Sequence, residues 1–237
     1  MNTNNNGYTL IYATVMVIIV ALMLALVSGA LKDTQNANVK LDKKKQILSS
    51  LKVNLDGADA AALYDQYIVS GMVIDIKAKV LSDSKEEAFD IDVIKEFSKK
   101  PESRKLPVYV AKVDGKTRFI IPLQGTGLWG PIWGYLALDD DCNTIYGSYF
   151  SHASETPGLG ANIADAPFQD QFKGKHILND KKEFVSVAVM KAGKIAEGKE
   201  QVDAIAGGTI TSKAVEKMLL DCLSQYDEFF KMGGIKK

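Results

Sequence analysis

The sequence has few of the residues that bind metal ions or cross-link a chain. Among its 237 residues are two cysteines, Cys142 and Cys222, and two histidines, His152 and His176. Without a Cys-x-x-Cys pair, and with only two separated histidines, these residues indicate neither a metal site nor a dense disulfide framework. We expect both cysteines in the core and both histidines solvated or hydrogen-bonded. A single disulfide between the cysteines is the alternative if the domain faces an oxidising compartment.

The chain also lacks a net charge, because its 29 lysine and arginine residues balance 29 aspartate and glutamate residues. No field concentrates a polyanion along such a surface, so nucleic acid is not expected as a partner. Apolar residues make up 46% of the sequence. Once a membrane anchor is set aside, this is enough for one domain with a core of ordinary size.

No charged residue precedes Lys32, and residues 10–31 are almost wholly apolar. At a rise of ~1.5 Å per residue, a helix of this length spans a bilayer. A cleaved signal peptide is the alternative, because Ser28-Gly29-Ala30 offers small residues, but the run is too long and has no basic leader. We expect a retained transmembrane helix over residues 10–31, after a tail of residues 1–9.

Residues 32–56 are expected to continue the helix as a stalk between the membrane and the domain. Lysines follow the expected membrane helix, and none precedes it. Taken alone, the positive-inside rule therefore places the domain in the cytoplasm, although the rule weakens when a long domain follows the helix. The lysines concerned are Lys32, Lys40, Lys43, Lys44, Lys45 and Lys52.

From residue 57 onward the pattern is that of an α+β domain. A short helix is expected from Asp59 to Tyr67, and Asp114-Gly115 is a hairpin turn between two strands. A helix over residues 211–231 has one apolar face, which would pack on the sheet. The sequence thus predicts one soluble domain over residues 57–237, with a mainly antiparallel sheet and packed helices. The expected strands cover residues 107–113, 117–123, 132–138, 144–150 and 183–190.

A first glycine-rich segment, residues 125–134, interrupts the expected strands. Its glycines let the backbone approach a flat ligand, and Leu128, Trp129 and Trp133 supply apolar walls for stacking. A glycine-kinked loop with the tryptophans in the core is the alternative.

A second glycine-rich segment, residues 151–160, has the features of a rigid, exposed loop. Its backbone and Thr156 can hydrogen-bond the polar edge of a heterocycle, while Leu159 covers the apolar part. A structural turn explains this segment equally well when it is taken alone.

A third glycine-rich segment, residues 202–215, runs straight into the last helix. Free N–H groups and the positive dipole end at a helix N-terminus bind phosphate, and three hydroxyl groups lie close by in sequence. An N-cap by Thr211 or Ser212 is the alternative, but it does not explain the paired glycines Gly207 and Gly208. A Walker loop is excluded, because Lys213 follows the serine instead of preceding it. The hydroxyl groups belong to Thr209, Thr211 and Ser212.

These three segments, in this order behind an N-terminal anchor, resemble the NqrC family of the sodium-translocating NADH:quinone oxidoreductase, and more distantly the RnfG family of Rnf-type complexes. The resemblance covers nearly the whole chain, and Leu41-Asp-Lys-Lys-Lys-Gln-Ile-Leu48 favours the NqrC group. It is carried by Gly127-Leu-Trp129, Glu155-Thr-Pro-Gly-Leu-Gly160, Phe172-Lys-Gly-Lys175 and Val202-Asp-Ala-Ile-Ala-Gly-Gly-Thr-Ile-Thr-Ser212.

The resemblance implies that a flavin transferase joins FMN to Thr209 as a phosphoester. The family pattern reads Ser-Gly-Ala-Thr-x-Thr-Ser, and this sequence departs from it with Ala206 for serine and Gly208 for alanine. Both changes are small and keep the backbone permissive. The residues expected to contact FMN are Leu128, Trp129, Thr156, Gly158, Leu159, Gly207, Gly208, Thr209, Thr211 and Ser212.

The family also implies an electron carrier inside a membrane complex that oxidises NADH, reduces quinone and exports sodium. Its partners would be the other membrane proteins of the complex, with the soluble domain on the extracytoplasmic side of the inner membrane, against the lysine count. No catalytic acid, base or nucleophile is required. The alternatives are an RnfG-type flavoprotein and, from another class, a membrane-anchored binding module without a redox cofactor. A domain cut near Asn54 is expected to fold alone.

Overall fold

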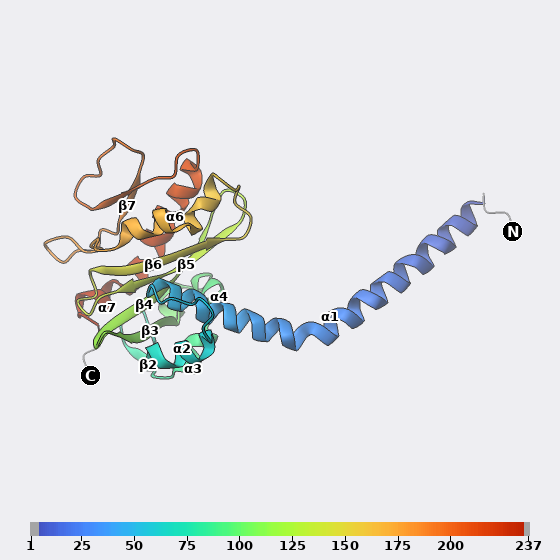
Figure 1. Cartoon of the computed structure of the whole chain (residues 1–237), viewed down its shortest axis with the longest axis horizontal. Helices are drawn as coiled ribbons and strands as arrows, with labels where there is room; N and C mark the ends of the chain where they lie inside the picture. The colour runs from blue at the N-terminus through green and yellow to red at the C-terminus, as the bar shows by residue number, and fades with distance from the viewer. Residues whose placement is uncertain (1–4, 235–237) are drawn as a thin grey trace. The chain divides into compact units, whose positions relative to one another are not determined.

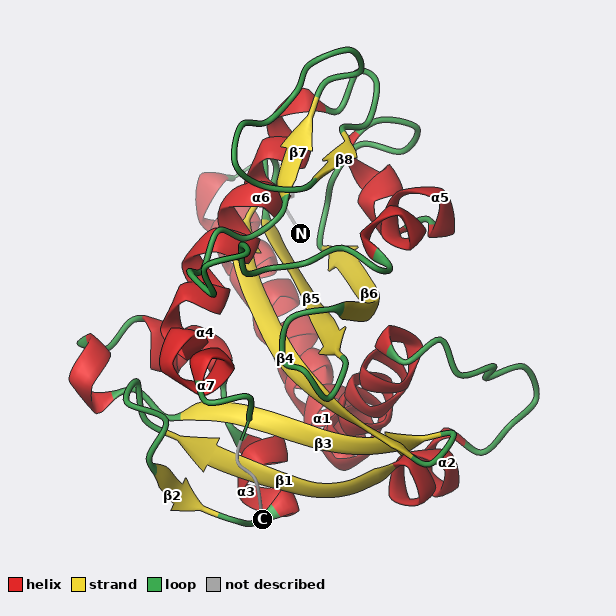
Figure 2. Ribbon diagram, turned by 90° about the vertical axis from the view of Figure 1, so that its left-hand side faces the viewer, coloured by secondary structure: helices red, strands yellow, loops and turns green. Residues whose placement is uncertain are grey.

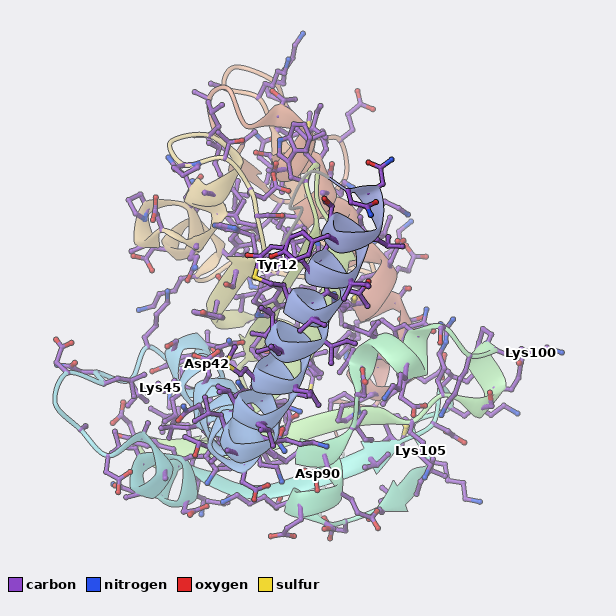
Figure 3. All side chains as sticks on the ribbon, turned by 90° about the vertical axis from the view of Figure 1, so that its right-hand side faces the viewer. Tyr12, Asp42, Lys45, Asp90, Lys100 and Lys105 are labelled. Atoms are coloured by element: carbon purple, nitrogen blue, oxygen red, sulfur yellow. The ribbon has the colours of Figure 1, made fainter. Side chains whose placement is uncertain are left out.

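The longest element is a helix near the N-terminus. The computed structural model describes residues 5–234, and helix α1 covers Asn6–Ser50 (Figure 1). The chain clusters into a first unit that ends at Lys43 and a second, compact unit that begins at Lys44. Between residues 10 and 27 the large apolar side chains of α1 are exposed, Tyr12 among them (Figure 3). By length and composition, α1 is a helix that can cross a membrane.

The compact unit is built on a six-stranded antiparallel sheet with the strand order β2-β1-β3-β4-β5-β6 (Figure 2). A separate pair of short parallel strands, β7 and β8, lies outside this sheet. The predicted α+β architecture with a mainly antiparallel sheet is therefore confirmed. The strands are β1 (Ile68–Ile74), β2 (Val80–Ser82), β3 (Leu106–Val113), β4 (Lys116–Thr126), β5 (Pro131–Leu138), β6 (Ile145–His152), β7 (Ala188–Met190) and β8 (Gln201–Asp203).

Short helices connect and cover the strands. The last long helix, α6, packs against β4, and its buried face includes Val215, Met218 and Leu219. The predicted packing of this helix on the sheet is confirmed. The remaining helices are α2 (Ala60–Tyr67), α3 (Lys85–Asp90), α4 (Val93–Phe97), α5 (Ala166–Gln169), α6 (Thr209–Leu223), α7 (Asp227–Lys231) and the 3-10 turns η1 (Pro101–Ser103), η2 (Gly160–Ala164), η3 (Asp170–Phe172) and η4 (Ser224–Tyr226).

The predicted hairpin is present, and β3 and β4 are joined at Asp114 and Gly115, which have φ values of 52° and 75°. Two central residues with positive φ form the turn type whose twist suits a tight hairpin. Strand β1 is not predicted by the sequence patterns. It follows α2 without a loop, and its central Gly71 lies so close to the backbone of Lys85 in α3 that a Cβ would contact it at 3.0 Å.

Two predicted elements differ in the structure. The strand expected over residues 183–190 is reduced to β7, because Ser186 has a φ of 60° and interrupts the extended backbone. The helix expected over residues 211–231 is broken after Leu223. There the side chains of Ser224 and Gln225 both donate to the carbonyl of Asp221, and this competes with the helical ladder.

The two cysteines are free and buried, so the disulfide alternative is wrong and the predicted core positions are confirmed. Cys222 Sγ lies 3.3 Å from the backbone N and 3.2 Å from the carbonyl oxygen of Gln124 on β4. The histidines are hydrogen-bonded as expected. The Nδ1 of His152 accepts from the backbone N–H of Glu155, and the Nδ1 of His176 lies 2.6 Å from a carboxylate oxygen of Glu200.

Burial raises the pKa of the Cys142 thiol and of the Cys222 thiol to about 12. Because the thiolate is the reacting species, we expect neither cysteine to react with a disulfide reagent at neutral pH while the chain is folded. Both should react after denaturation. Ellman titration of the detergent-solubilised chain measures this, and rapid labelling of one thiol in the folded chain would contradict the burial described here.

Candidate functional site

The three glycine-rich segments meet at the carboxylate of Glu155. Its Oε1 accepts from the backbone N–H of Trp129 at 2.8 Å, and its Oε2 accepts from the hydroxyl of Thr211 at 2.6 Å. The residue is 4% exposed. One side chain therefore joins the loop between β4 and β5, the loop after β6 and the first turn of α6. Sequence patterns predict that these three segments contact a ligand, but they give Glu155 no function.

The first turn of α6 has no side-chain cap. Its N-cap is Gly208, and Thr209 is the first helical residue. The hydroxyl of Ser212 accepts from the backbone N–H of Ile205, and the hydroxyl of Thr211 donates to Glu155. The alternative in which Thr211 or Ser212 caps the helix is therefore wrong.

Groups that suit an anion remain free at this helix end. In the described part of the chain, the backbone N–H groups of Thr209, Ile210 and Thr211 have no acceptor, and the half-buried Thr209 hydroxyl has no hydrogen-bond partner. The first N–H groups of a helix carry the positive end of its dipole. This arrangement can hold a phosphate beside the Thr209 oxygen.

Close contacts between the segments explain two of the glycines. A Cβ on Gly207, which has a φ of 76°, would lie 2.6 Å from the Leu159 side chain. A Cβ on Gly160 would overlap both the Thr211 hydroxyl and the Glu155 carboxylate. Substitution at either position would push the loop after β6 away from α6, so the site depends on glycine at both.

Four large apolar side chains on these segments are exposed, and we call them the apolar rim. Leu128 is 46% exposed, Trp129 65%, Leu159 42% and Ile210 60%. A cluster of apolar side chains left exposed on a soluble domain marks a binding surface. The sequence prediction omits Ile210, although an isoleucine among the threonines of a helix start is a signal that the sequence contains.

The loop after β6 is a tight turn. The carbonyl of Thr156 accepts from the N–H groups of Leu159 and Ala161, both at 3.1 Å, and Gly158 has a φ of 75°. This turn presents the exposed side chains of Thr156 and Leu159 to solvent. All ten residues predicted to contact a cofactor therefore lie on the three segments that meet at Glu155.

Trp133 is excluded from the apolar rim. It lies on β5, where its ring N–H donates to Gln46 near the end of α1 at 3.0 Å. Its neighbour Ile132 points to the other face of the sheet, because side chains alternate along a strand. The wall that Trp133 was expected to add beside Trp129 is therefore absent.

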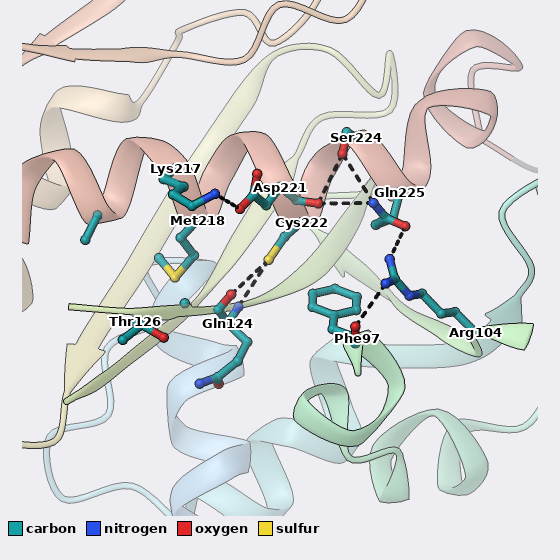
Figure 4. Close-up of a pocket in the computed structure, with 12 residues that line it drawn as sticks. Phe97, Arg104, Gln124, Thr126, Lys217, Met218, Asp221, Cys222, Ser224 and Gln225 are labelled. Carbon is teal, nitrogen blue, oxygen red and sulfur yellow. Dashed lines mark hydrogen bonds and ion pairs between the residues drawn. The ribbon is translucent and has the colours of Figure 1, made fainter. Parts of the chain in front are cut away.

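A pocket of about 480 Å³ lies along α6 next to the site (Figure 4). Gly125 and Thr126 at the end of β4 form one side of it, and they lead directly into the segment that bears Leu128. On α6 the pocket begins at Ala214, one helical turn beyond Ile210. Its other lining residues are Phe97, Arg104, Gln124, Lys217, Met218, Asp221, Cys222, Ser224 and Gln225.

Comparisons with known proteins agree with this geometry. Residues 127–224, which contain the second and third segments and all of the first except Gly125 and Thr126, match the family described as FMN-binding domain. The NqrC protein of the Na(+)-translocating NADH-quinone reductase from Pseudomonas aeruginosa is 31% identical over 92% of this chain and 91% of that protein. Its counterpart from Haemophilus ducreyi is 29% identical over 91% of this chain and 88% of its own length.

Solved NqrC structures are also similar. The NqrC of Parabacteroides distasonis is 44% identical, with a TM-score of 0.78 over 84% of this chain and 96% of that chain. The NqrC of Shewanella oneidensis is 26% identical, with a TM-score of 0.68 over 83% and 98% of the two chains. The resemblance found in the sequence is confirmed, and this chain belongs to the NqrC family of the Na(+)-translocating NADH-quinone reductase.

Proposed function

We propose that this chain carries FMN, joined through its phosphate to the Thr209 oxygen, and works as an electron carrier in a Na(+)-translocating NADH-quinone reductase. The observation that carries the proposal is the start of α6. There, among residues 5–234, a threonine hydroxyl without a hydrogen-bond partner stands beside three N–H groups without acceptors, next to the apolar rim. When bound, FMN supplies a ring that accepts and releases electrons.

Each part of the site has a role toward this cofactor. The first N–H groups of α6, with Gly207 and Gly208 leaving room, would hold the phosphate. Leu128, Trp129 and Leu159 would cover the ring, and the exposed Thr156 can hydrogen-bond its polar edge. The buried hydroxyls of Thr211 and Ser212 would fix the helix start. A covalent link keeps the cofactor in place when its affinity changes with its redox state.

We further propose that residues 10–31 of α1 anchor the chain in the inner membrane, with residues 1–9 as a tail and residues 32–43 as the stalk. The FMN domain would begin at Lys44 and face the extracytoplasmic side, as the family implies. The lysines after the helix favour the opposite side, but long domains cross membranes largely regardless of flanking charge, so they do not exclude this topology. The partners would be the other membrane proteins of the complex and, during maturation, a flavin transferase, and the complex would couple electron transfer to sodium export.

The mass of the purified full-length chain tests the proposal. We expect a mass increase of one FMN joined as a phosphoester, located on the peptide that contains Thr209, and a fluorescent band in a denaturing gel. The same spectrum shows whether the N-terminal helix is retained. An unmodified mass, without fluorescence, from a host that makes the flavin transferase would favour the binding module without a redox cofactor.

Truncating the apolar rim is expected to change the potential of the flavin and leave its attachment intact. In Trp129→Ala or Leu159→Ala, water reaches the ring and stabilises its more charged reduced form. The midpoint potential should therefore rise by about 30 mV, which corresponds to ~1.4 kcal/mol for a two-electron couple. A spectroscopic redox titration measures this. Ile195→Ala is the control, because Ile195 is 85% exposed but lies outside the rim. Unchanged potentials in both rim variants would show that the rim does not cover the flavin.

A further inference from the structure

We propose that Glu155 is a positioning residue. Its carboxylate fixes the Trp129 loop, which is residues 127–130 between β4 and β5, relative to the first turn of α6, and so sets the position of the apolar rim over the cofactor. This inference rests on the proposed function for its last step only. The geometry of the carboxylate itself can be tested without a cofactor.

Glu155 is a buried acid whose carboxylate is satisfied by hydrogen bonds. It is 4% exposed, and no lysine or arginine pairs with it among residues 5–234. The carboxylate accepts from the Trp129 N–H and the Thr211 hydroxyl, at 2.8 and 2.6 Å. A buried polar group is unfavourable unless its hydrogen bonds are made, so both donors are held at the carboxylate.

The backbone is shaped around this carboxylate. A Cβ on Gly127 would overlap Glu155 Oε1, and a Cβ on Gly160 would overlap Oε2. The two glycines belong to different loops, so each loop closes on a different oxygen of the same side chain. The N–H of Glu155 also donates to His152 at 3.2 Å, and this fixes the base of the loop that bears the carboxylate.

The groups joined by Glu155 are the ones that carry the proposed cofactor contacts. Trp129 is a member of the apolar rim, and Thr211 lies two residues after Thr209 on the same helical turn. Glu155 acts on the rim through Trp129 and Thr211. If the carboxylate loses one hydrogen bond, the Trp129 loop and α6 can separate. The ring of the proposed flavin would then have a different environment.

The first measurement uses the full-length chain with Thr209→Ala, which holds no ester, and follows hydrogen exchange at the Trp129 amide by mass spectrometry. Glu155→Gln replaces the charged acceptor of the Trp129 N–H with a neutral amide oxygen. Hydrogen bonds to a neutral acceptor are about half as strong, so this exchange should be at least about tenfold faster. Thr211→Val should also speed exchange at the Trp129 amide. Thr211→Ser keeps the hydroxyl, so exchange there should stay slow. Glu216→Gln is the control, since Glu216 lies on the same helix and pairs with Lys213.

The second measurement is the midpoint potential of the flavin-loaded chain. Glu155→Gln removes the charge of the carboxylate. Thr211→Val keeps that charge but removes the hydrogen bond from the Thr211 hydroxyl, so a positioning role requires a changed midpoint potential in both variants. If Glu155→Gln fails to fold, Thr211→Val alone decides both measurements. Unchanged exchange at Trp129, or an unchanged potential in Thr211→Val, would overturn the proposal. A chain without flavin but with faster exchange would instead refute the proposed function and leave the geometric role of Glu155 standing.

Discussion

Replacing Thr209 with alanine should give a folded, membrane-bound chain that carries no covalent flavin. The substitution removes the oxygen to which the proposed ester is attached. Thr209 is the first residue of α6, is half-buried, and makes no side-chain hydrogen bond in the described chain. Alanine is a good helix former, so the free energy of unfolding should change by no more than ~0.5 kcal/mol.

Intact mass and in-gel fluorescence measure the loss of flavin in Thr209→Ala, and a thermal melt checks that the fold is kept. Thr209→Ser is the matched control, because it keeps a hydroxyl at the same position of the helix and should retain at least part of the flavin. Fluorescence of the denatured Thr209→Ala chain would place the ester on another residue. A melting temperature far below that of the unchanged chain would show that the Thr209 side chain is needed for the fold.

Local patterns predict the parts of the site that lie close together in sequence. Gly207, Gly208 and Thr209 can be interpreted as a phosphate site because the signal occupies one short segment before a helix. The role of Glu155 cannot be predicted in this way. Its partners Trp129 and Thr211 are 26 and 56 residues away, and only the folded chain shows that its carboxylate is buried between them.

The same limit applies to the fold. The hairpin at Asp114 and Gly115 is predictable because its turn chemistry is local. Strand β1 escapes prediction, because it becomes a strand by pairing with β3 across a long intervening segment. The predicted end of α6 lies too far along the chain, because the apolar pattern continues through Tyr226 and Phe230 while the backbone changes to a 3-10 turn.

Sequence patterns also place the start of the compact unit too late. The predicted domain begins at residue 57, but the last turn of α1 packs on the sheet. Ile47 and Leu48 are 0% exposed and Leu51 is 1% exposed. A Cβ on Gly147 of β6 would overlap the Ser50 carbonyl, so helix and strand are in close contact there. Residues at the end of α1 therefore form part of the core.

A chain that begins at Lys44 should consequently be much more stable than one that begins at Asn54. Fully burying an aliphatic side chain contributes ~1.5–3 kcal/mol, so losing the three side chains before Asn54 should cost on the order of 4–9 kcal/mol. The total stability of a domain is typically ~5–15 kcal/mol. The shorter chain should therefore unfold at a much lower urea concentration or fail to fold, contrary to the expectation that a domain cut near Asn54 folds alone.

Urea unfolding of both chains, followed by circular dichroism, measures this difference. Leu48→Ala in the longer chain isolates the packing contribution and should lower its stability by ~2–5 kcal/mol. Lys45→Ala in the same chain is the control for changing the helix sequence without removing a buried apolar side chain. Equal urea midpoints for the two chains would mean that the last turn of α1 contributes nothing to the core. In that case the boundary predicted from the sequence would be the better one.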